Sequence, residues 1–309
     1  MQNTIDTISG LLASQGYRIS ETKQISYGVQ ITAVKNASKE NIRVYQNLQG
    51  RIKIDVSLVK DTALAALVSL QGDSTKTSLA NAPAPLCEPP LIGTDEAGKG
   101  DFFGPLCVAG VYCSKEDYQN LASLGVRDSK ELSGSQVSKL AAQIKKTCPI
   151  HKISICMPQQ YNALRASYPN LNDLLSAMHA ETIADIASRQ PSKHVLVDKF
   201  TGKKTIPGLL KDKMGALGIA NIIEAERAER NLAVAAASIL ARDAFVTSTD
   251  GLSKRFGQHL PLGASRAVDL ACAAFIGEYG KAALAQVAKL HFKNLSKGEL
   301  IYGQWQRAR

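Results

Sequence analysis

The chain has 309 residues, of which 45% are hydrophobic and 21% charged, and this balance excludes an intrinsically disordered protein. The length exceeds the usual size of a single domain, so it favours one large domain and a smaller one. Basic residues outnumber acidic ones, 37 to 27, and the net charge of +10 suits a polyanionic partner such as nucleic acid. Charge alone does not decide this, because many basic proteins bind no anionic partner.

The first 75 residues predict a small α+β domain. Four apolar residues recur at the spacing of one helix face: Ile5, Ile8, Leu11 and Leu12. Residues 25–34 are rich in strand formers, and residues 42–57 alternate apolar with polar side chains around an Asn47 to Gly50 turn, which predicts a hairpin. Residues 61–71 predict a second helix. Three basic residues occupy the polar side of the hairpin, where they either bind a nucleic-acid backbone or face solvent: Arg43, Arg51 and Lys53.

Residues 76–90 are rich in Pro, Ala, Ser and Thr without apolar periodicity, and we interpret them as a linker. Residues 91–309 then alternate strand with helix patterns, which predicts an α/β layer fold ending in a mostly helical part. The expected strands lie near 91–95, 105–113, 151–157 and 194–200, and residues 219–231 follow a Lys-rich stretch with no element assigned to them. The expected helices lie near 131–148, 171–188 and 232–245. We interpret the small residues from Leu232 to Leu240 as a packing feature of the last helix.

The cysteines and histidines indicate what kind of metal site to expect. No C-x-x-C or H-x-x-x-H pair occurs in the sequence, which disfavours zinc sites and redox dithiols. Any bound metal is therefore expected to have oxygen ligands. The first residues lack the features of a signal peptide, and the longest apolar stretch is shorter than the roughly 20 residues that cross a bilayer. We expect a cytoplasmic protein with no membrane partner.

Acidic residues stand at the ends of the predicted strands. Asp95 and Glu96 follow LIGT, Asp198 follows HVLV, and Glu229 precedes the helix that begins near Asn231. Any one of these acids alone is more typical of a cap, a turn or a surface ion pair. Several carboxylates that converge at the ends of core strands, however, require a cation, because an unpaired buried charge is costly. Oxygen ligands favour Mg²⁺ or Mn²⁺.

The segment DEAGKGDFFGPL surrounds the first two acids. Adjacent strand residues face opposite sides, so Asp95 and Glu96 can both face inward only if the chain bends, and the nearby glycines permit such a bend. Glycine also lets backbone N–H groups approach a ligand closely, and Lys99 adds a positive charge beside them. The segment matches neither a P-loop nor a dinucleotide-binding fingerprint.

Six segments spanning residues 91–294 resemble, in order, the motifs of bacterial ribonuclease HIII: GTDEAGKGDFFGPLCVAG, GVRDSKELS, VLVDKF, RAERNLAVAAASILARDAF, LPLGAS and AKLHFKN. Ribonuclease HII shares the DE-x-G-x-G and AAAS themes, but DFFGP, HFKN and a separate N-terminal domain are more similar to type HIII. The resemblance implies an α/β RNase H-like catalytic domain, with a mixed sheet flanked by helices, at residues 91–309. It also implies an N-terminal α+β domain similar to half of a TATA-binding protein, with a substrate-binding role.

The resemblance also implies the site residues. The family's catalytic and metal-binding acids fall on Asp95, Glu96, Asp198 and the acid before the AAAS helix. We assign the fourth acid to Glu229, because it keeps the family's basic-Ala-acid pattern. The interval after it is one residue shorter than the family pattern, so Glu226 remains a rival and Glu224 a more distant one. The substrate-binding residues implied by the resemblance are Gly98, Lys99 and Gly100.

The activity implied by the resemblance is hydrolysis of the RNA strand of RNA/DNA hybrids by two-metal-ion catalysis with Mg²⁺ or Mn²⁺. This chemistry leaves 5′-phosphate and 3′-hydroxyl ends. The 2′-hydroxyl is the group that distinguishes RNA from DNA at one position, and the backbone of residues 98–100 is its expected reader. No obligate protein partner is evident. Two alternatives stay open: cleavage at single ribonucleotides embedded in duplex DNA, as in ribonuclease HII, and hybrid binding without catalysis.

Overall fold

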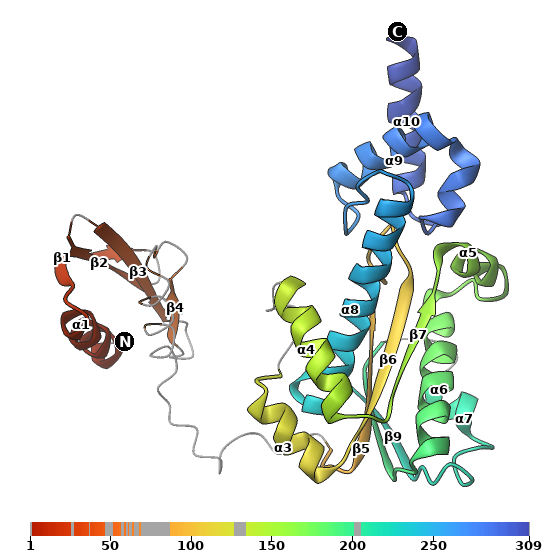
Figure 1. The fold of residues 1–309 in the computed structure, drawn as a ribbon, viewed down its shortest axis with the longest axis horizontal. Helices are drawn as coiled ribbons and strands as arrows, with labels where there is room; N and C mark the ends of the chain where they lie inside the picture. Colours follow the sequence, from red (N-terminus) through yellow and green to blue (C-terminus); the bar gives the residue numbers. More distant parts are fainter. Residues whose placement is uncertain are drawn as a thin grey trace. The chain divides into compact units, whose positions relative to one another are not determined.

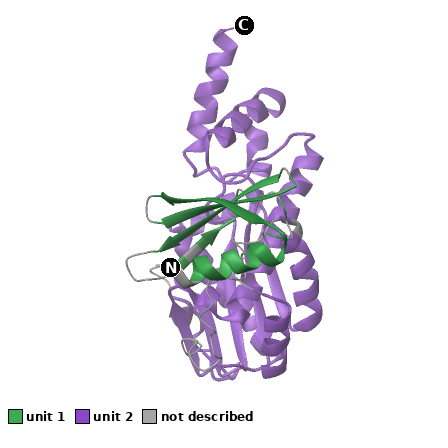
Figure 2. Ribbon diagram, turned by 90° about the vertical axis from the view of Figure 1, so that its left-hand side faces the viewer, with its two compact units in different colours: residues 1–84 green, residues 85–309 purple. Residues whose placement is uncertain are grey.

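The computed structural model describes residues 2–25, 28–36, 38–46, 52–56, 59, 61, 64, 68, 87–126, 134–200 and 205–308. The chain forms two compact units, residues 1–84 and 85–309, coloured separately in Figure 2. The predicted turn from Asn47 to Gly50, Arg51 and most of the helix predicted at 61–71 lie outside the described residues, as does the side chain of Lys53.

The described residues of unit 1 include one complete helix and a four-stranded antiparallel sheet of order β1-β2-β3-β4 (Figure 1). Its elements are α1 (Gln2–Ser14), β1 (Arg18–Ile25), β2 (Gly28–Lys35), β3 (Ser38–Gln46) and β4 (Ile52–Asp55). Ile8 and Leu12 of α1 are fully buried in one core with Ile31 and Ile42 of the sheet, so the predicted helix face is confirmed. The predicted hairpin is also confirmed, since β3 and β4 pair from Gln46 opposite Ile52.

The sheet of unit 2 has five strands in the order β7-β6-β5-β8-β9. The strands are β5 (Leu91–Ala97), β6 (Leu106–Cys113), β7 (His151–Cys156), β8 (His194–Asp198) and β9 (Asn221–Ala225). The β5, β6 and β7 strands pair antiparallel, whereas β5, β8 and β9 pair parallel, so the sheet is mixed. A parallel pair requires a crossover, and the connection from β5 to β8 contains several helices.

Helices cover both faces of this sheet (Figure 1). They are α3 (Lys115–Ser123), α4 (Gly134–Thr147), α5 (Pro158–Ser167), α6 (Leu171–Arg189), α7 (Ile206–Leu210) and α8 (Leu232–Arg255). The C-terminal part consists of α9 (Arg266–Tyr279), η3 (Lys281–Gln286) and α10 (Asn294–Arg307), around a core of its own. The alternation of strands and helices expected for the second region is therefore confirmed.

The central strand β5 contacts a helix on each face. A Cβ at Gly93 would lie 2.5 Å from the backbone carbon of Ala233, so the absence of a side chain there permits the close approach of α8. On the other face Thr94 contacts α6, with its Oγ1 2.8 Å from Nδ1 of His179. Because strand side chains alternate, residues at odd positions of β5 face α8 and those at even positions face α6.

The helix α8 is long and apolar enough to pass a length and composition test for a membrane span, the one such helix in the described part of the chain. Most of that apolar stretch is buried inside unit 2, where it packs against β5, β6 and α4. Its composition therefore follows from its position in the core. The six cysteines are also buried in this unit, and none forms a disulfide.

Candidate active site

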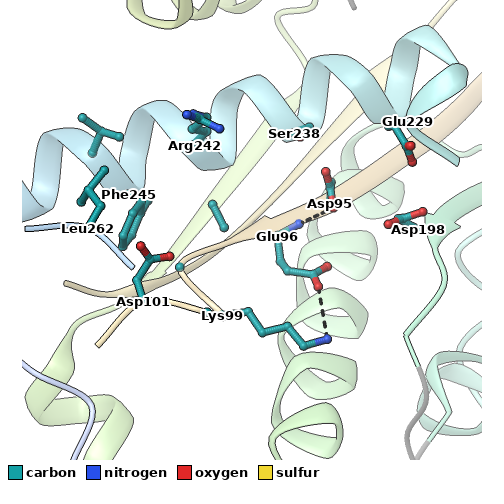
Figure 3. A pocket seen from close by; sticks show the side chains of 14 residues that line it. Asp95, Glu96, Lys99, Asp101, Asp198, Glu229, Ser238, Arg242, Phe245 and Leu262 are labelled. Carbon is teal, nitrogen blue, oxygen red and sulfur yellow. Dashed lines mark hydrogen bonds and ion pairs between the residues drawn. The ribbon is translucent and has the colours of Figure 1, made fainter. Parts of the chain in front are cut away.

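A cavity of about 420 Å³ opens at the carboxyl end of β5 (Figure 3). All four predicted acids line it: Asp95, Glu96, Asp198 and Glu229. The predicted substrate-binding residues 98–100 line it as well, and α8 forms another wall. The structure thus brings together residues that lie up to 134 positions apart, from 95 to 229.

The cavity exists because β8 pairs with only part of β5. The parallel pairing ends at Thr94 opposite Val197, whereas β5 continues beside β6 as far as Ala97 opposite Cys107. The edge of β5 toward β8 therefore opens at Asp95. The strand runs unbroken through Asp95 and Glu96, so no bend is needed to bring both acids to the cavity. The chain turns only afterwards, at Gly98, where φ is +88°.

Asp95 lies on the α8 face of the strand and is partly buried. Its Oδ1 accepts a hydrogen bond of 2.8 Å from the backbone N–H of Glu96, and its carboxylate also accepts one from the Ser238 hydroxyl. Burial, together with the charges of Glu96 and Asp198, raises the pKa of Asp95 to about 8, although these hydrogen bonds oppose the shift. An acid with these neighbours binds either a proton or a cation at neutral pH.

Glu96 lies on the α6 face and points away from Asp95, toward Lys99 (Figure 3). Its Oε1 is 3.7 Å from Lys99 Nζ, and its Oε2 is 3.3 Å from His179 Nε2. Burial raises the pKa of Glu96, but the hydrogen bonds from His179 and Lys99, together with the positive charge of Lys99, outweigh burial, so the net shift is downward. The two consecutive acids therefore differ in charge state when no cation is bound.

Asp198 and Glu229 are linked through a short 3₁₀ turn, η2 (Ala228–Arg230). Oδ1 of Asp198 accepts a 3.0 Å hydrogen bond from the backbone N–H of Ala228, the residue before Glu229. Arg227 enters this turn in the left-handed region, with φ of 57°. The two carboxylates point toward one another in Figure 3. The turn places Glu229 on the cavity although it precedes α8 rather than following a strand.

The rival acids lie elsewhere. Glu226 has an 83% exposed side chain and pairs with Lys199, with Oε1 3.6 Å from Nζ. Glu224 sits within β9, opposite Val197 of β8. Neither residue is part of the cavity lining, whereas Glu229 is.

The loop after β5 is held in place from several directions. A Cβ at Gly98 would come within 2.3 Å of the Pro105 carbonyl oxygen, whereas a Cβ at Gly100 would contact nothing within 4 Å. Asp101 accepts a 2.6 Å hydrogen bond from the Gly263 N–H through Oδ1. The buried ammonium of Lys289 donates to three consecutive carbonyls that follow the loop: Phe103, Gly104 and Pro105. The loop is therefore rigid at its base and open at residue 100.

The donor set fits a hard divalent cation. Four carboxylates line the cavity, and oxygen ligands of this kind suit Mg²⁺ and Mn²⁺. Burial, followed by the nearby carboxylates of Glu96 and Asp198, raises the pKa of Asp95, and a cation bound there would favour its ionised form. No group of three or more acidic, histidine or cysteine side chains in the described ranges stands ready to hold an ion as it is. Binding therefore requires these carboxylates to move closer together and Oε1 of Glu96 to exchange Lys99 for the cation.

Three further residues contribute to the site without having been predicted from the sequence. Ser238 and Arg242 of α8 line the cavity, one helical turn apart, and Ser238 bonds Asp95. The interpretation of residues 232–240 as packing alone was therefore incomplete. His179 of α6 bonds Glu96 from the other face of the strand. The AAAS motif was a usable signal for Ser238, whereas nothing in the local sequence distinguishes His179 from a core histidine.

Comparisons with known proteins agree with this geometry. A family model described as Ribonuclease HII matches residues 92–295. A Ribonuclease HIII from Protochlamydia amoebophila is 44% identical over 206 residues, 67% of this chain and 67% of that protein. A Ribonuclease HIII from Bacillus cereus is 38% identical over 219 residues, 70% of each. The solved structure of Bst-RNase HIII in complex with Mn²⁺ matches 97% of both chains with a TM-score of 0.64 and 26% identity.

The chain belongs to the bacterial ribonuclease HIII family. It is accordingly a ribonuclease H, and the alternative of a hybrid-binding protein without catalysis is set aside. The RNase H-like fold expected for the second region is confirmed by the structural match. The antiparallel sheet and helix of unit 1 are compatible with the small α+β domain expected in the ribonuclease HIII family.

Proposed function

We propose that this ribonuclease H cleaves the RNA strand of RNA/DNA hybrids internally, leaving 5′-phosphate and 3′-hydroxyl ends. The observation that carries the proposal is the convergence of Asp95, Glu96, Asp198 and Glu229 on one open cavity beside the Gly98 to Gly100 loop. A site for phosphodiester hydrolysis needs concentrated carboxylates to bind cations and nearby donors to bind the substrate backbone. Both are present within the same cavity.

The same four acids are the proposed ligands for two divalent cations, Mg²⁺ or Mn²⁺. Two bound cations supply an activated water and neutralise charge on the scissile phosphate and leaving oxygen. Asp95, between the other carboxylates, is the proposed shared ligand, because the charges of both Glu96 and Asp198 act on it. The Ser238 hydroxyl bonds Asp95 and favours its ionised form, which is the form that binds a cation.

The loop is the proposed reader of the ribose. Nothing within 4 Å occupies the space beside the Cα of Gly100, so a sugar edge can approach the backbone there. Selection for RNA requires a contact to the 2′-hydroxyl, which backbone N–H and C=O groups can make. Lys99 and Arg242, both on the cavity wall, are the proposed phosphate ligands.

Unit 1 is the proposed auxiliary binding domain for the hybrid. Arg43 on β3 is bonded to Gln30 on β2, with Nε 3.0 Å from Oε1, so a basic side chain is held in a defined place on the sheet. An ordered cation binds phosphate at a lower entropic cost than a free one. The substrate-binding role of residues 1–75 and their separation by a linker at 76–90 remain part of this proposal.

The decisive experiment compares three matched duplexes with Mg²⁺ or Mn²⁺: an RNA/DNA hybrid, double-stranded RNA, and DNA with one embedded ribonucleotide. We expect cleavage of the RNA strand of the hybrid and no cleavage of double-stranded RNA. End labelling should identify 5′-phosphate and 3′-hydroxyl products. Cleavage at the single ribonucleotide would add a type HII activity, a possibility favoured by the Ribonuclease HII family model that matches residues 92–295. Bound but uncleaved hybrid would contradict the proposed reaction.

A further inference from the structure

We infer that His179 is a positioning residue that holds the Glu96 carboxylate in the orientation needed to bind a divalent cation. This inference rests on the proposed function, because it assumes that Glu96 is a metal ligand. His179 itself does not line the cavity and would not touch the substrate. It would act through Glu96 from the α6 face of β5.

The geometry gives His179 two partners on one strand. Its Nδ1 is 2.8 Å from Oγ1 of Thr94, and its Nε2 is 3.3 Å from Oε2 of Glu96. Thr94 and Glu96 are two residues apart on β5, so their side chains share one face. The imidazole therefore spans two successive positions of the strand that carries the acids.

Hydrogen-bond chemistry assigns a direction to each contact. The ionised Glu96 carboxylate only accepts, so Nε2 donates to it, and Nδ1 then accepts from the Thr94 hydroxyl. Both ring nitrogens are satisfied in this arrangement, which matters because His179 is completely buried. Thr94, also completely buried, fixes the tautomer and thereby points the ring N–H at Glu96.

The ring is held in place from a second side. Phe200, two residues after Asp198, packs against it with ring centroids 5.1 Å apart. Lys99 Nζ lies 5.5 Å from the centre of the same Phe200 ring and 3.7 Å from Oε1 of Glu96. His179 thus fixes one oxygen of Glu96, while the other faces Lys99 at the edge of the cavity. Only the latter oxygen can exchange its partner without loss of the buried hydrogen bond.

A histidine with a purely structural role would hydrogen-bond only residues that lie outside the cavity. His179 instead donates to a carboxylate of the cavity, and hydrogen-bond partners of metal-binding carboxylates typically affect metal affinity or activity 10- to 100-fold. The two roles predict different results. A structural role affects thermal stability, whereas a positioning role affects cation affinity even where stability is unchanged.

The test uses full-length protein and a titration with Mn²⁺ alone, in which the free ion is measured by electron paramagnetic resonance. His179→Leu removes the donor, and His179→Gln keeps an amide N–H that can reach Glu96. Thr182→Val is the matched control, since Thr182 is buried on the same helix and loses only a 3.1 Å contact to Ser154. Circular dichroism and thermal unfolding report folding, and kcat and KM for an RNA/DNA hybrid are measured at saturating and at limiting Mn²⁺.

We expect His179→Leu to raise the Mn²⁺ dissociation constant by about 10-fold or more. Its kcat at limiting Mn²⁺ should fall while KM for the hybrid stays within about two-fold, because Glu96 is not a substrate ligand in the proposal. His179→Gln should recover part of the affinity, and Thr182→Val should match the parent. Equal Mn²⁺ affinity of His179→Leu and the parent would overturn the inference, as would an equal loss in Thr182→Val.

Two safeguards keep the test decisive. If His179→Leu fails to fold, the Mn²⁺ affinities of His179→Gln and Thr94→Val test the inference instead. Thr94→Val keeps the imidazole ring and removes only the hydroxyl that orients it. A raised Mn²⁺ dissociation constant in Thr94→Val supports the inference, and parental affinity in both variants overturns it. The Mn²⁺ titration needs no substrate. A parent protein that binds Mn²⁺ but cleaves no hybrid would therefore refute the proposed function and leave the result for His179 standing.

Discussion

Asp95 and Glu96 are consecutive residues whose carboxylates reach one cavity from opposite faces of β5. Asp95 accepts from Ser238 of α8, and Glu96 accepts from His179 of α6. The strand thus presents one acid to each helical layer, and the open edge beside β8 lets both line the same space. This arrangement assigns different partners, and different directions of pKa shift, to neighbouring residues.

The first prediction concerns the role of Asp95. Asp95→Asn keeps the shape of the side chain and removes its charge, so cation binding at the shared position should be lost. We expect kcat on the RNA/DNA hybrid to fall by on the order of 10³-fold or more, the scale of losing a major electrostatic contribution to catalysis. Hybrid affinity measured by anisotropy should persist, since basic groups contact the phosphates. Retained turnover would remove Asp95 from the catalytic set.

The second prediction separates the two candidates for the fourth acid. Glu229 lines the cavity, whereas Glu226 is exposed and pairs with Lys199. Glu229→Gln should lower kcat and raise the Mg²⁺ or Mn²⁺ concentration needed for half-maximal activity. Glu226→Gln should behave like the parent, because an exposed ion pair contributes little. The reverse pattern in steady-state assays would exchange the two assignments.

The third prediction concerns stability without metal. Asp95 ionises near 3.8 when unfolded and near 8 when folded, so between these values the folded protein retains a proton that the unfolded chain releases. The free energy of unfolding should therefore fall as pH rises through this window, by at most about 1.4 kcal/mol per pH unit from this group. Urea unfolding in EDTA at several pH values measures it.

Asp95→Asn is the control for that measurement, since it cannot ionise. The difference in stability between the parent and this variant should grow in the variant's favour from about pH 4 to about pH 8 and then level off. Added Mg²⁺ should stabilise the parent most at the upper end of the window. A pH-independent difference between the two proteins would show that Asp95 is not buried in its protonated form.

The fourth prediction compares two glycines of the loop. Gly98 has a φ of +88° and no room for a Cβ, whereas a Cβ at Gly100 would have no neighbour within 4 Å. Gly98→Ala should lower the free energy of unfolding by about 1 kcal/mol or more. Gly100→Ala should leave stability unchanged but raise KM for the hybrid, if the sugar edge approaches there. Thermal unfolding and steady-state kinetics distinguish the two effects.

The fifth prediction tests the role of unit 1. Removal of residues 1–80 should raise KM for the hybrid and leave kcat nearly unchanged, because the acids lie in unit 2. The dependence of affinity on salt concentration should also become less steep, since fewer phosphates are contacted. An unchanged KM would exclude a binding role for this unit.

The sequence predicts elements wherever periodicity is strong. The helix predicted at 171–188 is α6 and the strand predicted at 151–157 is β7, each within one residue. The strand β1 was not predicted because most of its residues are exposed and polar, so apolar alternation is absent. The helix α3 was not predicted for a similar reason, because Leu121 is its one buried residue and no apolar periodicity results. Its capping box, in which Ser114 and Asp117 bond each other, was a signal that could have located its start.

The acidic residues of the site could be predicted from the sequence, but the residues that hydrogen-bond to them could not. Strand ends meet at a sheet edge, so Asp95, Glu96 and Asp198 follow from the pattern of strands. Ser238 and His179 are the partners of these acids because of the particular turns of α8 and α6 that pack against the two faces of β5. That depends on tertiary packing, including the close contact of Gly93 with Ala233, and no local pattern encodes it.

All six thiols are buried in residues 85–309, whereas residues 1–84 contain no cysteine. Burial raises the pKa of several of these thiols, Cys107 and Cys272 to about 12, so they are poor nucleophiles in the native state. Alkylating reagents should therefore modify the protein only when the larger unit opens. Thiol alkylation therefore measures the unfolding of residues 85–309 and gives no signal when residues 1–84 unfold.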